Sequence, residues 1–392
     1  MRHLRIIIAL LVNFIIFGVS LTIIGATLPK IIKDFEWSYI ATGIVLSSGS
    51  IGYFVSSFIS GILLHKLGPK LVIVIGLMLQ CLGLLFFAAT PFVWLNMILN
   101  LMIGFGQGGT EVVVNFSVVR IEQSGKSRLM NLMHAAFSVG AVIGPYIVIL
   151  LMRMNLGWQM VYRLMSAVSL IMIVVFLAIP FSHIRKEDET DDKKVGVGKL
   201  LKNPVLVLSF LILFVYVGSE LGVSNWISEF YVNYFNKPAE TGAFMVSIFW
   251  IGLLVGRLGT SIFYKGSRPA FVALGLATIC TISLLFALLV KQPIISGIGF
   301  ALAGFGYSAI YPLIMALVGR YFTKAQGAAV GFAATGGGFG SFLFPFIMSA
   351  ISQSFGIYKG FFFYFALNIL MVGLIIAIIT LTRKFRSQTS EA

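Results

Sequence analysis

The sequence predicts an all-α polytopic membrane protein with twelve transmembrane helices, arranged as two pseudo-symmetric six-helix bundles. Apolar residues make up 59% of the 392 residues and charged residues 10%, a composition typical of chains that lie mostly in a bilayer. Twelve apolar stretches are long enough to cross about 30 Å of hydrocarbon. The segments 101–120 and 302–320 resemble each other, which indicates an internal repeat.

The expected spans follow one another with short connections, except after the sixth. They cover 5–28, 38–64, 71–90, 93–119, 128–152, 158–182, 204–230, 241–264, 269–290, 293–318, 326–352 and 357–382. Lipid-exposed segments must satisfy their own backbone hydrogen bonds, so these spans are expected to be helices. The first is a retained helix and not a cleaved signal peptide, because its apolar run exceeds about twenty residues and eleven spans follow. We expect an N-terminal bundle over 1–182, a polar cytoplasmic linker over 183–203 and a C-terminal bundle over 204–392.

The net charge of +15 is distributed unevenly between the two sides of the membrane. Twenty of the 28 basic residues lie in segments on the side of the N-terminus, and seven lie on the other side. By the positive-inside rule, both termini and the linker are cytoplasmic in an inner or plasma membrane. No soluble segment combines basic and aromatic residues as nucleic-acid sites do, and no loop is long enough for a catalytic domain. The chain is therefore predicted to bind no nucleic acid, not to be an enzyme, and to need no cofactor or metal. Cys81 and Cys280 are expected to pack within helices.

The repeat points to a transporter. Gly104, Gly106 and Arg120 recur as Gly304, Gly306 and Arg320, while the position of Glu111 is taken by Tyr311 in the second copy. Two related halves are typical of secondary transporters, whose substrate site lies between the repeats at mid-membrane depth.

Glu111 and Glu220 are the two acids expected deep in the bilayer, with Glu229 at the outer rim. A carboxylate at that depth faces a cavity or a partner, or is held protonated, and is functional by default; the alternative is a structural buried acid. Gln107 and Asn115 lie one turn before and after Glu111 on one helix face, where their amides suit sugar hydroxyls.

Further candidates surround these acids. Around Glu220 we expect substrate contacts from Tyr216, Asn225 and Trp226, and elsewhere from Trp250 and Tyr311, because an aromatic ring stacks on the apolar face of a hexose; packing is the competing interpretation. His134 is either a proton relay with Glu111 or a neutral packed histidine. Arg257, near the cytoplasmic end of its helix, is a gate residue or an anchor.

The layout resembles the major facilitator superfamily over the whole chain. The loop signature of that superfamily is similar to 61–70, with His65 where an acid is usual, and the resemblance implies that His65 and Lys66 belong to a cytoplasmic gate. Four segments are similar to the fucose and glucose:proton symporter family: 106–115, 216–226, 249–257 and 310–312. That resemblance implies that Glu111 couples proton and sugar movement. No acid occurs over 20–25, where the fucose member has one, so the glucose-type members match better.

The sequence therefore predicts a monomeric, proton-coupled symporter of a monosaccharide such as glucose, mannose or fucose. A sodium-coupled sugar symporter is one alternative. A proton-coupled exporter of drugs or lipids is another, because 140–145 resembles a motif of antiporters. A sensor or scaffold would need an appended signalling domain, which the sequence lacks.

Overall fold

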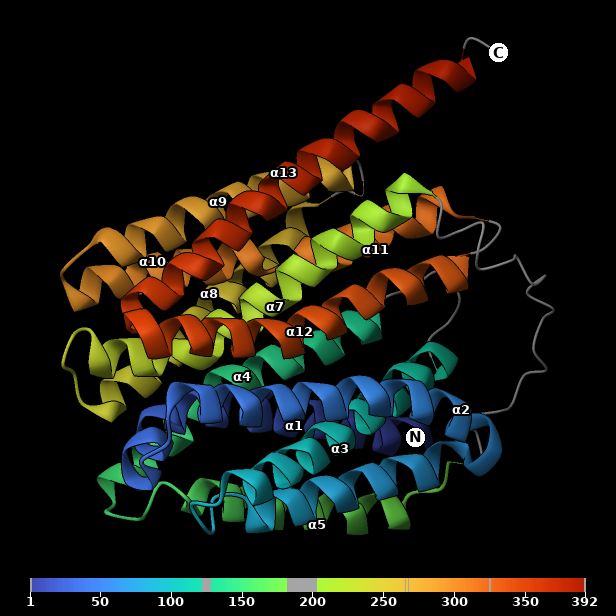
Figure 1. The fold of residues 1–392 in the computed structure, drawn as a ribbon. Helices are drawn as coiled ribbons and strands as arrows, with labels where there is room; N and C mark the ends of the chain where they lie inside the picture. Colours follow the sequence, from blue (N-terminus) through green and yellow to red (C-terminus); the bar gives the residue numbers. More distant parts are fainter. Residues whose placement is uncertain are drawn as a thin grey trace.

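The computed structural model describes residues 2–121, 128–181, 203–264, 266, 268–323 and 326–390. All regular secondary structure within these residues is helical (Figure 1). Eleven stretches of the described chain are long and apolar enough to cross a membrane. The helices are α1 (Arg2–Phe35), α2 (Tyr39–Phe86), α3 (Val93–Ile121), α4 (Arg128–Arg153), α5 (Met160–Ala178), α7 (Pro204–Asn233), α8 (Ala239–Phe263), α9 (Pro269–Leu289), α10 (Pro293–Tyr307), α11 (Ile310–Tyr321), α12 (Gln326–Phe355) and α13 (Ile357–Ser390).

The molecule has two ends, which we call the Trp37 end and the Gly68 end. At the Trp37 end, the indole of Trp37 donates to the carbonyl of Pro91 at 2.7 Å, so the turn after α1 lies beside the turn before α3. At the Gly68 end, the Lys70 ammonium donates to the carbonyl of Leu177 at 2.6 Å. The second part of α2 therefore starts next to the last turn of α5.

The number of helices differs from the expected spans in two places. The expected spans 38–64 and 71–90 join in the 48-residue α2, in which Gly68 is non-helical with φ 78° and ψ 163°. Glycine adopts this left-handed φ without steric cost, and Pro69 suits the start of the next helical segment. Conversely, the expected span 293–318 is divided, because Ala309 leaves helical geometry with φ −128° and ψ 8°.

Buried apolar side chains form two clusters. One consists almost entirely of residues from α1 to α5, and the other almost entirely of residues from α7 to α13. Figure 1 shows the same division, with α1 to α5 (blue to green) below α7 to α13 (yellow-green to red). We call these groups the N-half and the C-half.

The halves meet where α2 packs on α12, α4 on α8, and α1 on α7. Serine hydroxyls donate to backbone carbonyls across this boundary. The bonds are Ser47 to Phe342 at 2.6 Å, Ser228 to Ala26 at 3.3 Å and Ser247 to Val142 at 2.9 Å. All three lie between the middle of the helices and the Trp37 end, so the halves are tied together there.

The predicted linker, 183–203, lies outside the described residues except for Asn203. That residue caps α7, because its side chain accepts a hydrogen bond from the backbone N–H of Val205 at 2.9 Å. Cys81 and Cys280 are free cysteines, as expected for residues that pack within the helices.

Candidate functional site

Glu111 lies half-buried on α3, against Tyr53 of α2. The Tyr53 hydroxyl donates a hydrogen bond to Oε2 of Glu111. Gly108 makes this possible, because a side chain at that position would collide with the carbonyl oxygen of Tyr53. The close approach of α2 and α3 therefore places a phenol against the carboxylate.

The other polar groups of this face come from both halves. Gln107 is buried one turn before Glu111, and Asn115 is half-buried one turn after it. The Asn115 Oδ1 is buried without a hydrogen-bond partner among the described residues. Tyr311, on α11 of the C-half, interacts electrostatically with Glu111. The carboxylate thus has amides on its own helix and phenols from either half.

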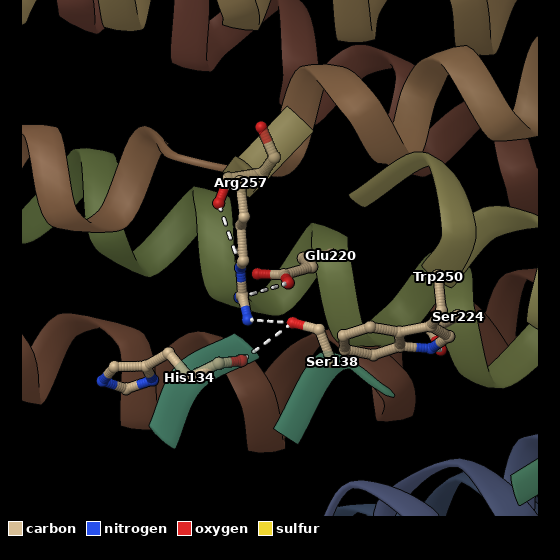
Figure 2. A network of polar contacts seen from close by, with 7 residues as sticks. His134, Ser138, Glu220, Ser224, Trp250 and Arg257 are labelled. Atoms are coloured by element: carbon tan, nitrogen blue, oxygen red, sulfur yellow. Dashed lines mark hydrogen bonds and ion pairs between the residues drawn. The ribbon is translucent and has the colours of Figure 1, made fainter. Parts of the chain in front are cut away.

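Glu220 of α7 has a different partner, the guanidinium of Arg257 on α8 (Figure 2). Nη2 of Arg257 lies 3.7 Å from Oε1 of Glu220, and the two side chains are 25% and 7% exposed, respectively. A buried carboxylate beside a cation keeps its charge compensated. Of the two acids predicted to lie deep in the bilayer, Glu220 is therefore the one with a positive partner.

Arg257 also holds two other elements. Its Nη1 donates to the Ser138 hydroxyl of α4 at 2.9 Å, and its Nε donates to the Ser308 carbonyl at 3.2 Å. Ser308 follows α10 at the break before α11, where carbonyls lack intrahelical partners and a cation is favourable. Ser138 in turn donates to the carbonyl of His134 at 3.0 Å. Figure 2 shows the guanidinium between Glu220 and Ser138, so one side chain connects the N-half to the C-half.

Tyrosines connect the two acids. The buried Tyr216 interacts electrostatically with Glu220, and its ring centroid lies 6.4 Å from that of Tyr311. Since Tyr311 neighbours Glu111, a continuous group of carboxylates and phenols crosses from α3 to α7. This is the arrangement expected of a site shared by two halves.

The remaining candidates lie around this group. The His134 side chain is exposed, packs edge-on against Phe14 at 6.1 Å and has Arg257 as its electrostatic neighbour. The geometry thus links His134 to the Glu220–Arg257 pair, whereas its proposed relay with Glu111 stays a prediction. Trp250 is buried and donates to the Ser224 hydroxyl at 2.7 Å.

Asn225 and Trp226 lie closer to the Trp37 end of α7. Asn225 is half-buried where α7 crosses α1, with its backbone against Gly25. Trp226 is fully buried, and its indole nitrogen has no hydrogen-bond partner among the described residues. At the opposite end, His65 and Lys66 are exposed in the turn of α2 before Gly68, which is compatible with the predicted gate.

Sequence reasoning missed Tyr53, Ser138 and Ser308. Tyr53 lies among the small residues of 49–61, a pattern that indicates close helix packing. Such packing brings a polar side chain within reach of the next helix, and this was the available signal. For Ser308 the signal was Pro312, which has no backbone N–H and so leaves the Ser308 carbonyl without its helical donor. Ser138 carried no signal, because its role depends on where the Arg257 side chain extends.

Comparison with known proteins identifies the family. The model of the Major Facilitator Superfamily matches residues 10–321. The chain belongs to this superfamily. The glucose/mannose transporter GlcP of Bacillus subtilis is 22% identical over 335 residues, which are 81% of this chain and 82% of that protein. Bypass of stop codon protein 6 of Saccharomyces cerevisiae is 26% identical over 278 residues, which are 64% of this chain but only 55% of the yeast protein.

Solved structures share the fold. The nucleoside transporter NupG superimposes with a TM-score of 0.77 at 16% identity, covering 96% of this chain and 98% of that one. A variant of the fucose:proton symporter FucP of E. coli gives a TM-score of 0.64 at 19% identity, covering 96% of this chain and 99% of that one. The superfamily member described here therefore resembles sugar symporters in sequence and fold.

Proposed function

We propose that this protein is a secondary active transporter that carries a monosaccharide together with protons by alternating access. In this proposal α2 crosses the membrane twice on either side of Gly68, while α10 and α11 form one interrupted crossing. Twelve crossings in two six-helix bundles, 1–182 and 204–392 with the linker 183–203 between them, result. Interrupted helices near the bilayer centre are a recurring feature of transporter sites.

The observation that carries the proposal is the contrast between the two acids. Glu220 has Arg257 as its counter-ion, whereas Glu111 has the Tyr53 phenol and, close by, that of Tyr311. A charged carboxylate at the bilayer centre costs at least about 2.5–3.5 kcal/mol. Binding a proton removes that charge without a cation, which makes Glu111 the coupling residue that best fits a proton-driven cycle.

A hydroxylated substrate fits the polar groups near Glu111. The amides of Gln107 and Asn115 both donate and accept hydrogen bonds, as sugar hydroxyls do. A pocket for lipophilic drugs would be lined mainly by apolar side chains, so export of drugs or lipids is disfavoured. The names of GlcP and FucP support a hexose. The name of NupG makes a nucleoside, which also carries sugar hydroxyls, the second candidate.

The distribution of charge supports an orientation. The Gly68 end carries the excess of basic residues, so we assign it to the cytoplasm, with both termini, and the Trp37 end to the outside. The protein is proposed to act as a monomer in an inner or plasma membrane. Its partners are the lipid bilayer, the transported sugar and the coupling proton.

Counterflow in proteoliposomes tests the function. Vesicles loaded with unlabelled glucose, mannose, fucose or uridine are diluted into the labelled compound, with and without a pH or sodium gradient. We expect counterflow of one or more hexoses and accumulation driven by a pH gradient. Counterflow of uridine alone would replace the sugar by a nucleoside, and accumulation driven by sodium alone would replace the proton.

A further inference from the structure

Tyr39 joins the two halves at the Trp37 end through three separate contacts. Its backbone N–H donates to Oε1 of Gln353 on α12 at 2.8 Å, and its hydroxyl donates to Oε1 of Glu229 on α7 at 2.9 Å. Its ring packs edge-on against Trp226 with centroids 5.7 Å apart. One residue of the N-half therefore holds two helices of the C-half.

The contact to Gln353 completes a helix cap from the other half. The first N–H groups of a helix have no intrahelical acceptor. At the start of α2, the Ser38 side chain accepts from the N–H of Ala41 at 3.1 Å, which leaves the N–H of Tyr39 without a local acceptor. Gln353 supplies that acceptor. Separating α12 from α2 would transfer this N–H to water.

The contact to Glu229 is shielded from solvent. Glu229 is 3% exposed and Trp226 is fully buried, although both lie in the last two turns of α7. Tyr39 is the titratable group that contacts Glu229 among the described residues. A buried acceptor that loses its hydrogen-bond partner costs free energy, so this bond stabilises the closed arrangement.

We infer that Tyr39, Glu229 and Gln353 form a latch that holds the Trp37 end closed and that breaks each time the transporter opens there. The inference rests on the alternating access of the proposed function, and on neither its sugar nor its proton. Because a hydrogen bond contributes about 1 kcal/mol net, losing the phenol should raise the open population about fivefold.

Accessibility of a buried reporter measures this population without any substrate. In a background with Cys81→Ser and Cys280→Ser, Ser228→Cys places a thiol at a buried position of α7 that faces the N-half. We expect Tyr39→Phe to raise the rate of maleimide labelling in detergent about fivefold, and Gln353→Ala to raise it as well. Tyr146→Phe is the matched control, because Tyr146 packs edge-on against Phe244 across the halves and should leave labelling unchanged.

Cross-linking tests whether the latch must open. In the same cysteine-free background, Tyr39→Cys with Gln353→Cys is joined by a short reducible bis-methanethiosulfonate. Hexose counterflow should stop and return on reduction. The control pair, Asp34→Cys with Trp158→Cys, joins two N-half residues that are hydrogen-bonded at 2.6 Å and should leave counterflow intact.

Each outcome bears on the latch separately from the substrate. Unchanged labelling in both Tyr39→Phe and Gln353→Ala, or full counterflow after cross-linking, would refute the latch. Faster labelling in a protein that carries no sugar would support the latch and reject the proposed substrate. Glu229→Gln retains an oxygen acceptor for the phenol, so it should label more slowly than Glu229→Ala; equal rates would exclude Glu229 from the latch.

Discussion

Arg257 of α8 and Ser138 of α4 are hydrogen-bonded at 2.9 Å, and they join the C-half to the N-half beside the candidate site. The same guanidinium is the counter-ion of Glu220. The charge state of one buried acid is therefore linked to a contact that a rigid-body movement of the halves would change. We therefore expect substitutions of Arg257 to affect both stability and transport.

Replacing Arg257 by Ala should destabilise the protein through Glu220. Removing one partner of a buried ion pair costs about 3–5 kcal/mol, because the other charge is left uncompensated. Arg257→Ala should therefore lower the unfolding temperature in detergent. The double variant with Glu220→Gln should recover most of the loss, since no unpaired charge remains. Equal unfolding temperatures for the single and double variants would show that the pair is energetically unimportant.

Replacing Glu111 by Gln should uncouple transport. The amide keeps an oxygen acceptor for the Tyr53 phenol and a similar shape, but it cannot take up or release a proton. We expect gradient-driven accumulation to be abolished while counterflow of the substrate persists. Concentrative uptake at the wild-type rate would show that Glu111 is not the coupling residue.

A side chain at Gly108 should separate α2 from α3. Gly108→Val would force the carbonyl of Tyr53 away and cost about 1–3 kcal/mol through overpacking, and it would move the phenol from Glu111. We expect a lower unfolding temperature together with reduced uptake.

Gly373→Ala is the control for Gly108→Val. Gly373 lies in α13 with open space where a side chain would extend. Alanine there should leave uptake unchanged and stabilise the helix by about 0.5–1 kcal/mol. If Gly108→Val were as stable and active as Gly373→Ala, the close approach of α2 and α3 would contribute to neither stability nor uptake.

Hydropathy predicted the helices well because lipid imposes a simple rule on composition and length. The expected span 93–119 corresponds to α3, Val93–Ile121. The break at Ser308 and Ala309 has a signal in the sequence, because Pro312 has no backbone N–H to donate to the Ser308 carbonyl four residues earlier and its ring crowds that carbonyl. The sequence could not show that the Arg257 guanidinium, on another helix, binds the freed carbonyl.

Part of the candidate site could also be predicted from the composition of the spans. Glu111 and Glu220 stand out because acids are rare within apolar spans. The sequence could not show that Arg257 pairs with Glu220 and that Glu111 has a phenol instead, because these partners lie on other helices. In the sequence Tyr53 resembles a packing residue, and only the contact between α2 and α3 shows that its hydroxyl reaches Glu111. A single cavity lined by Gln107, Asn115, Glu220, Trp226 and Tyr311 stays a prediction.

The last prediction concerns the coupling ion. Sodium usually needs several oxygen ligands in a cage. The amides of Gln107 and Asn115 lie on the same helix as Glu111, and the groups that approach Glu111 from other helices are the phenols of Tyr53 and Tyr311. Phenols donate to a carboxylate and are poor ligands for a hard cation while protonated. We therefore expect uptake to depend on pH and to be insensitive to sodium.

The direction of the pH dependence follows from the order of binding. The outward-facing Glu111 must take up a proton before the sugar is carried inward, so raising the external pH lowers the fraction of carriers that are loaded. Uptake should fall as external pH rises, and a protonophore should collapse accumulation. In Glu111→Gln, counterflow should lose this pH dependence, because the group that titrates is gone. Accumulation driven by a sodium gradient at equal pH, and resistant to the protonophore, would instead require a cation site that the oxygen atoms around Glu111 do not provide.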